Sequence, residues 1–230
     1  MSIYRVLLSG GMDSAVCLAW AKTQAATVEG VFFNYGQQHL ERERAAAAEM
    51  AELAGVVLRN EALALPASNL NGDASELDAA SAVVPGRNRM FLLRAALMRP
   101  VASDLVIGAC ADDAEHFPDC RPLFYEEMRH LMRPVRIHTP LIDKSKSEVV
   151  AAARRFADVL NIDALSWVRA SWSCYRGGDT PCGNCGACEA RALAVACPFC
   201  TAEPGVKCYH PNHGFVQTHR ERVAASLDLP

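Results

Sequence analysis

Small and polar residues near the start of the chain form the string Ser9-Gly10-Gly11-Met12-Asp13-Ser14, which has the composition of an anion-binding loop. Adjacent glycines let the backbone turn tightly and present consecutive N–H groups, and a following helix adds the partial positive charge of its N-terminus. The string lacks the lysine and the spacing of the G-x-x-x-x-G-K-S/T nucleotide-binding loop. It therefore predicts a phosphate site of another kind, although Gly-Gly turns also join strands to helices that bind no ligand.

Seven of the ten cysteines lie between Cys174 and Cys208, mostly as C-x-x-C pairs. This is the spacing of metal ligands rather than of a secreted disulfide framework. The first cluster, Cys174, Cys182, Cys185 and Cys188, offers four thiolates, which predicts a closed tetrahedral zinc site with a structural role. Four thiolates also bind iron–sulfur clusters, so that alternative stays open.

A second cluster follows, with the string Cys197-Pro198-x-Cys200, then Cys208, and then His210, His213 and His219. This pattern resembles the short zinc fingers of phage and actinobacterial proteins. From Leu193 onward three basic residues accompany three acidic ones, so contact with nucleic acid is a weak prediction, and structural capping or protein contact is an equal alternative. The expected ligands of this second zinc are Cys197, Cys200, Cys208 and His219, with His210 or His213 as the substitute for His219.

The elements that must position these residues alternate along the chain up to about residue 160. Short β-branched runs alternate with longer Ala-rich stretches, which predicts a doubly wound, mostly parallel α/β sheet with ligands at the carboxyl ends of its strands. The polar interval 62–85 is expected to be a loop, either a plain connector or a mobile lid. The expected strands are 6–8, 28–33, 56–58 and 105–107, and the expected helices are 13–24, 40–53, 89–103 and 145–159.

The length of 230 residues suits one domain with a small appendage, which we place at residues 1–194 and 195–230. With 51% hydrophobic residues the chain can bury a core, which excludes a disordered protein. The formal net charge of -3 gives no overall attraction to nucleic acid or acidic membranes. The sequence contains no apolar run of about 18 residues and no signal-peptide pattern, so we expect a cytoplasmic protein without a membrane partner.

Further polar strings occur at intervals along the chain. They begin at Asn34 (N-Y-G-Q, with His39), Pro85 (P-G-R-N), Pro118 (P-D-C-R), His138 (H-T-P-L), Lys146 (K-S-E) and Trp172 (W-S-C-Y). Together with the S-G-G-x-D-S loop and the first four cysteines, this set resembles the 7-cyano-7-deazaguanine synthase family of the ATP pyrophosphatase superfamily, over residues 3 to about 194. The resemblance implies an adenine nucleotide alpha hydrolase-like fold.

The resemblance also implies an ATP-dependent ligase that converts 7-carboxy-7-deazaguanine and ammonia to 7-cyano-7-deazaguanine. Adenylation makes AMP the leaving group at the carboxylate, ammonia gives the amide, and a second adenylation of the amide oxygen allows dehydration to the nitrile. Mg²⁺ accompanies the ATP phosphates next to Asp13, and a homodimer is the implied assembly. ATP, Mg²⁺ and two zinc ions are therefore the expected cofactors.

Charged and polar residues of these strings are the candidate site residues. Asp113 and Asp119 suit the guanine-like edge of a deazapurine, because carboxylates accept hydrogen bonds from paired N–H donors. Arg87, Arg121 and Lys146 suit phosphates or the substrate carboxylate. A surface role is the alternative for any one of these charges, as a structural role is for His39. We expect Asp13, Lys146 and Asp113 to be catalytic, Ser9, Gly10, Gly11, Asp13, Ser14 and Arg87 to bind ATP, and Tyr35, Gln37, His39, Asp113, Asp119 and Arg121 to bind the substrate.

One departure from the family lies between Asp113 and Phe117, where relatives read aromatic-Ser-Gly and this chain has Ala114-Glu115-His116. A carboxylate and an imidazole beside the heterocycle leave open an enzyme that stops at 7-amido-7-deazaguanine. A tRNA thiolase of the same superfamily is the nearest enzymatic rival, which the net charge and the P-D-C-R string disfavour. A non-catalytic zinc-finger protein that binds nucleotide or nucleic acid is the rival of another class. Of the remaining cysteines, Cys17 is expected in the core and Cys120 at the site.

Overall fold

The β-branched runs form one five-stranded sheet in the computed structural model of the chain, and all neighbouring strands are parallel. The order across the sheet is β3-β2-β1-β4-β5, which confirms the predicted doubly wound α/β fold. The structure describes residues 2–65, 83–161, 163–176, 178–193, 195, 203–204, 209–210, 214–215, 222 and 225. The strands are β1 (Ile3–Leu7), β2 (Thr27–Asn34), β3 (Val57–Ala62), β4 (Asp104–Val106) and β5 (Arg136–His138).

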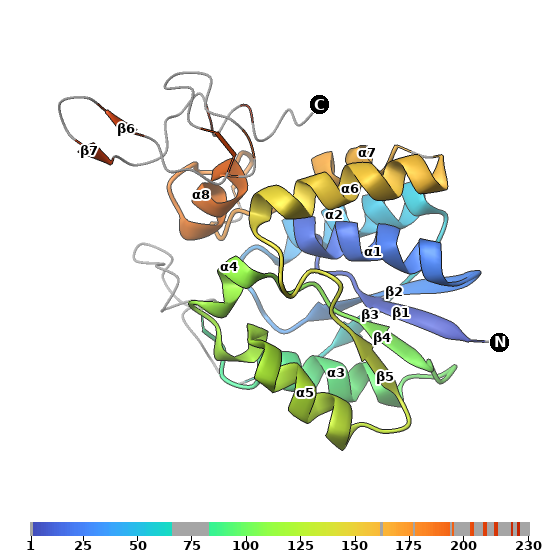
Figure 1. Cartoon of the computed structure of the whole chain (residues 1–230). Coiled ribbons are helices and arrows are strands. Elements are labelled where there is room, and N and C mark those ends of the chain that lie inside the picture. The colour runs from blue at the N-terminus through green and yellow to red at the C-terminus, as the bar shows by residue number, and fades with distance from the viewer. Residues whose placement is uncertain are drawn as a thin grey trace.

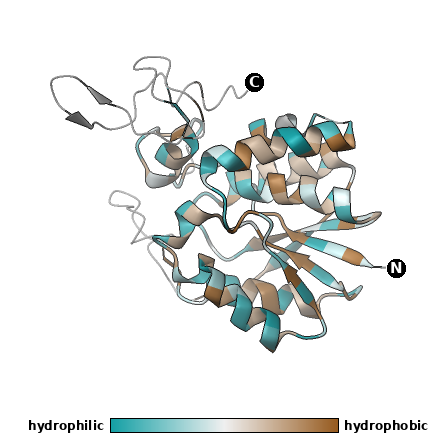
Figure 2. Ribbon diagram, in the orientation of Figure 1, coloured by the Kyte–Doolittle hydropathy of each residue, from teal (hydrophilic) through white to brown (hydrophobic). Residues whose placement is uncertain are grey.

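Helices cover both faces of the sheet (Figure 1). In Figure 2, hydrophobic and hydrophilic residues are mixed along α5 (Pro122–Leu131) and α6 (Lys146–Leu160). This mixture is expected for helices that pack one apolar side against the sheet and expose the other to solvent. One face of the sheet is covered by α6 together with α1 (Met12–Gln24), α2 (Leu40–Ala54) and α7 (Ala164–Arg169). The other face is covered by α5 together with α3 (Arg87–Leu97).

Successive residues of the central strands pack into two separate cores. Val6 and Leu8 join the core beneath α1, α2 and α6, whereas Leu7 joins the core beneath α3 and α5. Because side chains alternate along a strand, a strand covered on both faces must be apolar at nearly every position. That requirement explains why the continuous β-branched runs predicted four of the five strands.

The predicted boundaries needed correction in several places. Helix α3 ends at Leu97 instead of residue 103, because Met98 is extended and Pro100 follows, and proline disfavours helical backbone in the residue before it. Strand β5 escaped prediction because it is only three residues long and two of them are Arg136 and His138. The expected loop at 62–85 begins after Ala62, which closes β3, and its residues 66–82 lie outside the described part of the chain.

The C-terminal part contains α8 (Gly186–Leu193) and an antiparallel pair, β6 (Tyr209–His210) and β7 (Gly214–Phe215). Arg222 is fully buried and donates to the carbonyl oxygens of Ala192 (2.9 Å) and Glu203 (3.0 Å), so it meets the end of α8. The domain boundary at residues 194–195 stays a prediction.

The predicted second zinc site cannot be described. Its residues Cys197, Cys200, Cys208 and His219 lie outside the described residues, as does His213, and the side chain of His210 does too. Among the helices that are described, none has the length and apolar character required to cross a membrane.

Candidate active site

A cavity of about 1060 Å³ lies where the loops after β1, β2 and β4 meet the N-terminal ends of α3 and α6 and the residues of α8. These loops leave the carboxyl ends of the strands, where doubly wound sheets bind ligands. Gly10, Asp119 and Arg121 do not border the cavity. The other predicted ATP, substrate and catalytic residues do: Ser9, Gly11, Asp13, Ser14, Tyr35, Gln37, His39, Arg87, Asp113 and Lys146.

The loop between β1 and α1 is held together by its own hydroxyl groups. The Gly11 N–H donates to Ser9 Oγ (3.3 Å), and Ser14 Oγ donates to the Gly11 carbonyl oxygen (2.8 Å). Gly11 is also the N-cap residue of α1 and borders the cavity, so the positive end of this helix faces the site. The local geometry is that of an anion cradle.

The backbone conformation of Gly10 and its close contact with α2 both require glycine at this position. Its φ of +84° lies in the left-handed region, and a Cβ atom at Gly10 would lie 2.3 Å from the carbonyl oxygen of Glu43 in α2. No larger residue fits without moving α2 or the loop. Gly10 therefore allows the loop to pack closely against α2, on the side of the loop away from the cavity.

Lys146, the first residue of α6, lies between two carboxylates of the site. Its Nζ is 2.6 Å from Asp13 Oδ2 and 3.3 Å from Asp113 Oδ1. Its backbone N–H donates to Asp112 Oδ2 (2.8 Å). The three residues predicted to be catalytic thus meet from α1, α4 (Ala111–Ala114) and α6.

Burial and charge oppose each other in this cluster. Burial is the main reason that the pKa of Asp13 is raised; Asp113 adds to the increase and Lys146 opposes it. Burial also disfavours a charged Lys146, yet Asp13 and Asp113 raise the pKa of its ammonium group well above the ordinary value. Lys146 therefore keeps its proton and carries a positive charge at the phosphate loop.

One oxygen of the cluster is left over. Asp13 Oδ1 is buried and has no hydrogen-bond partner within the described part of the chain. A buried polar atom without a partner is costly, and carboxylate oxygens are ligands that Mg²⁺ prefers. Ligand atoms of Asp13, Asp113 and Cys110 lie within 4.8 Å of one another. The two carboxylates therefore fit a divalent cation.

Aromatic rings form another wall of the cavity. Phe33 and Phe91 stack with their ring centroids 4.6 Å apart, and Tyr35 tilts against Phe91 at 5.5 Å. The Arg87 guanidinium lies 5.9 Å from the centroid of the Tyr35 ring and donates to its hydroxyl (3.4 Å). Stacked rings beside one guanidinium suit a flat heterocycle with an anionic substituent.

His39 and Gln37 support the wall between the phosphate loop and α2. His39 is 4% exposed, and its Nε2 and Nδ1 lie 3.2 Å from Glu43 Oε1 and from the Tyr175 carbonyl oxygen. Burial disfavours the imidazolium, but Glu43 and then the Tyr175 carbonyl raise the pKa of His39 above its ordinary value. Gln37 donates to Glu43 Oε2 (3.1 Å). Because both nitrogens of His39 are engaged, its geometry favours the structural alternative, and a substrate contact stays a prediction.

The P-D-C-R string presents only its cysteine to the cavity. Asp119 Oδ2 accepts from the Asn88 N–H (3.1 Å) at the start of α3, and Arg121 Nε donates to the Ala114 carbonyl oxygen (3.2 Å). Cys120 borders the cavity as predicted, and burial raises the pKa of its thiol to about 12. Substrate contacts by Asp119 and Arg121 stay predictions.

The first four cysteines assemble as predicted. The sulfur atoms of Cys174, Cys182, Cys185 and Cys188 all lie within 4.8 Å of one another. Hydrogen bonds from Cys185 and Cys188, and then from the N–H groups of Cys182 and Arg176, lower the pKa of Cys174 below its ordinary value. Four sulfur atoms this close to one another fit a metal.

Several residues of the cavity had no clear signal in the sequence. Glu43 lies one helical turn after His39, Phe91 lies three residues after Asn88, and Glu189 lies on α8, a helix that the sequence did not indicate. Asp112 is the exception, because it adjoins Asp113 in the chain. Helical periodicity around the motifs is the signal by which the others could have been found.

An anion cradle at the first βα junction of a doubly wound sheet, next to a Lys–Asp cluster, defines an α/β nucleotide-binding protein. The chain belongs to the family of the queuosine biosynthesis protein QueC, whose family model matches residues 4–197.

Relatives of known name agree with this assignment. A 7-cyano-7-deazaguanine synthase from Chromobacterium violaceum is 39% identical over 83% of this chain and 88% of the relative. One from Synechococcus sp. (strain RCC307) is 34% identical over 82% of this chain and 92% of the relative. A solved structure, the U34-tRNA thiolase NcsA from Methanococcus maripaludis with its 4Fe-4S cluster, aligns with a TM-score of 0.45 and 20% identity over 70% of this chain and 58% of that chain. Similarity at that level bears on neither the reaction nor the metal.

Proposed function

We propose that this chain is an ATP-dependent ligase that makes 7-cyano-7-deazaguanine from 7-carboxy-7-deazaguanine and ammonia. Membership of the QueC family and the relatives of that name support this reaction. The structural observation that carries the proposal is the contact of Lys146 Nζ with Asp13 and Asp113 beside the anion cradle. This arrangement puts a fixed positive charge at the position where a leaving pyrophosphate develops negative charge.

The phosphate loop holds the β- and γ-phosphates of ATP while the substrate carboxylate oxygen attacks the α-phosphorus. The N-terminus of α1 and the hydroxyls of Ser9 and Ser14 orient these phosphates, and Lys146 stabilises the departing pyrophosphate. Asp13 and Asp113 would hold Mg²⁺, which supplies further charge neutralisation between phosphates. The chain thus contributes positioning and electrostatics.

The aromatic wall binds the deazapurine. Arg87 was expected from the sequence to bind ATP, but it lies against Tyr35 of this wall, and we assign it instead to the substrate carboxylate. A guanidinium binds a carboxylate through two parallel hydrogen bonds, which fixes the oxygen that attacks ATP. Ammonia then attacks the adenylated carbon and AMP leaves, giving the amide. In the second cycle the amide oxygen attacks another ATP, and loss of AMP and a proton leaves the nitrile.

We further propose zinc at the four-cysteine site, where the alternative is an iron–sulfur cluster. Metal analysis of the purified protein distinguishes them: zinc without iron is expected, and a brown protein containing iron overturns the assignment.

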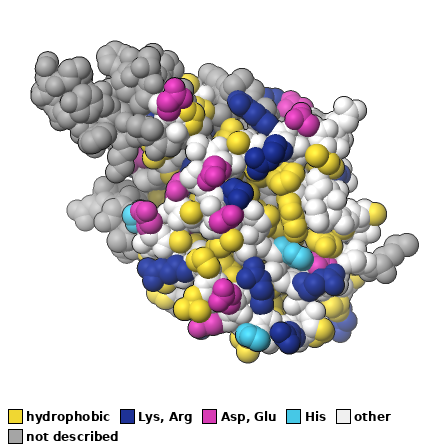
Figure 3. Space-filling model, in the orientation of Figure 1, with side chains coloured by type: hydrophobic (Ala, Val, Ile, Leu, Met, Phe, Trp, Pro, Cys, Tyr) yellow, Lys and Arg dark blue, Asp and Glu magenta, His cyan; other side chains and the backbone are white. Residues whose placement is uncertain are grey.

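Thiolate ligands and the use of ATP both suit the cytoplasm, which is the proposed location. The second zinc site, the homodimer and a nucleic-acid contact of the C-terminal segment stay predictions. Figure 3 shows acidic and basic side chains interspersed on the described part of the face that it displays, whereas nucleic-acid binding is typically marked by clustered basic residues.

The test is product analysis with ATP, Mg²⁺, ammonium and 7-carboxy-7-deazaguanine. We expect complete conversion to the nitrile with about two pyrophosphates released per product, since each adenylation releases one. Asp13→Asn is the inactive control, and Asp158→Asn, an exposed aspartate of α6, is the matched active control. Amide as the final product identifies the amide synthetase, and bound but unconsumed ATP overturns the enzymatic proposal.

A further inference from the structure

The loop that carries the first metal-binding cysteine is hydrogen-bonded to the phosphate loop. The backbone N–H of Trp172 donates to the Gly10 carbonyl oxygen (2.8 Å). A Cβ atom at Gly11 would lie 3.8 Å from the Trp172 carbonyl oxygen, so the two backbones run in contact. Trp172 precedes Cys174 by two residues. A displacement of the metal-binding loop would therefore displace the backbone of the anion cradle through these direct contacts.

A second connection leads from the same metal loop through α2. The carbonyl oxygen of Tyr175, the residue after Cys174, meets His39 Nδ1 (3.2 Å), and His39 Nε2 meets the Glu43 carboxylate (3.2 Å). The backbone oxygen of Glu43 is in turn the atom against which Gly10 packs. The contacts form a closed circuit of Gly10, Trp172, Cys174, Tyr175, His39 and Glu43.

We propose that the metal bound by the four cysteines positions the phosphate loop, through Trp172 on one side and through His39 and Glu43 on the other. His39 and Trp172 are then positioning residues that act on ATP through the loop. The metal fixes Cys174, and Cys174 fixes its neighbours at both ends of the circuit. Without the metal this segment loses its anchor, because folding of such loops is coupled to metal binding.

The inference rests on the ATP-binding part of the proposed function, and it requires that ATP and the metal affect each other's binding reciprocally. If the metal favours the loop geometry that binds ATP, bound ATP must by the same factor raise the affinity for the metal. Differences in affinity between related complexes lie mainly in the dissociation rate, so we expect this gain as slower release of the metal. A purely structural metal, independent of the phosphate loop, has no such coupling. The rate at which the metal leaves the protein is therefore a readout that does not depend on turnover.

The experiment measures metal release from the metal-loaded protein to an excess of the chromogenic chelator 4-(2-pyridylazo)resorcinol, with and without saturating Mg-ATP. We expect ATP to slow release by about tenfold, within the usual range of coupling between sites. Free ATP binds zinc weakly and would accelerate release, so slowing reports on the protein. The affinity for ATP, measured by calorimetry before and after removal of the metal, should fall by a similar factor.

His39→Gln tests the route through α2, and His130→Gln, an exposed histidine of α5, is the matched control. The His39 variant should release its metal faster and lose most of the ATP effect, whereas the control should behave as the parent. An unchanged release rate in the parent at saturating ATP, together with an ATP affinity that removal of the metal leaves unchanged, overturns the inference even if the variant fails to fold. If the metal-loaded parent shows no affinity for ATP, the proposed function itself has failed.

Discussion

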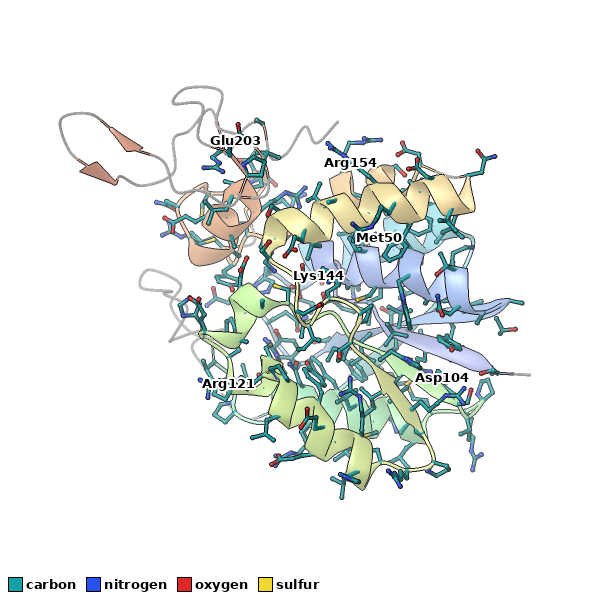
Figure 4. All side chains as sticks on the ribbon, in the orientation of Figure 1. Met50, Asp104, Arg121, Lys144, Arg154 and Glu203 are labelled. Carbon is teal, nitrogen blue, oxygen red and sulfur yellow. The ribbon has the colours of Figure 1, made fainter. Side chains whose placement is uncertain are left out.

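Both ends of the sheet carry buried charges, but within the described part of the chain only the carboxyl-terminal end leaves a charged group without all of its hydrogen-bond partners. At the amino-terminal end, Asp104 of β4 is fully buried and accepts from Arg136 Nη2 (2.7 Å) and from Ser2 and Ser103 (2.8 and 2.6 Å). His138 completes this set at 2.7 Å. Figure 4 labels Asp104 beside β4 and β5, at the end of the sheet away from α4.

A second network lies in the same half of the sheet. Arg5 of β1, also fully buried, donates to Glu29 Oε1 (2.6 Å) and to the Pro100 carbonyl oxygen (2.6 Å), and Arg59 donates to Glu29 Oε2 (2.8 Å). These charges satisfy one another and hold β1, β2, β3 and the end of α3 together.

At the carboxyl-terminal end the arrangement differs. Asp13 Oδ1 has no partner among the described residues, Lys146 faces two carboxylates, and the cluster borders the cavity. Buried polar groups are normally paired, and the exceptions gather where ligands bind. Completed networks thus hold the sheet together, whereas the incomplete cluster lies at the cavity where we propose that phosphate and a cation bind.

The largest effect is expected from Asp13→Asn. The substitution should lower the rate of pyrophosphate release by about 10⁴-fold or more, as loss of a key catalytic group does in other enzymes. Burial disfavours the Asp13 carboxylate, and the amide oxygen of Asn can still accept from Lys146 Nζ, so unfolding in urea should show only a small change in stability. A variant that releases pyrophosphate at the parent rate would remove the carboxyl-terminal cluster from catalysis.

Arg5→Met addresses the opposite end. Removing one partner from this buried network leaves Glu29 and the carbonyl oxygens of α3 incompletely paired, which should cost about 3–5 kcal/mol in free energy of unfolding. The kcat of the folded fraction should stay unchanged. Arg154→Met, an exposed arginine of α6 (Figure 4), should leave the urea midpoint where it is. Loss of kcat with intact stability would contradict the division between the two ends.

Asp104→Asn should change the pH dependence of stability. Burial alone would raise the pKa of Asp104, but hydrogen bonds from Arg136, Ser103 and His138 hold it well below the ordinary value. Its stabilisation is therefore complete above about pH 3.9, the unfolded value, and is lost as the pH falls through the folded one. Urea unfolding at pH 7 and pH 3 should show a gap between parent and variant that narrows in acid. A constant gap would mean that the charge of Asp104 contributes nothing.

The smallest effect is expected from Glu115→Ser with His116→Gly, which restores the residue types of the family beside the cavity. Both side chains are exposed at its border, so the KM for 7-carboxy-7-deazaguanine should change by less than about tenfold. Mass analysis with excess ATP should find the nitrile from both proteins. Amide that accumulates with the parent and disappears with the double variant would instead establish this loop as the determinant of the product.

Features that depend on neighbours in the chain could be predicted from the sequence. The Ser9–Ser14 string contained the hydroxyls and glycines of a loop that closes on itself, and the spacing of Cys174, Cys182, Cys185 and Cys188 brought four sulfurs together. The strands covered on both faces were equally predictable, since such burial demands apolar residues in succession.

Contacts between residues far apart in the chain depend on the tertiary structure. Lys146 reaches Asp13 across 133 positions of the chain, and His39 reaches Tyr175 across 136. It also turned His138, part of a family string, toward Asp104 and the Tyr4 ring (centroids 5.3 Å apart). The direction of a side chain in a three-residue strand depends on how that strand pairs with its neighbours, because successive residues face opposite sides of the sheet. A linear motif holds no information about that pairing.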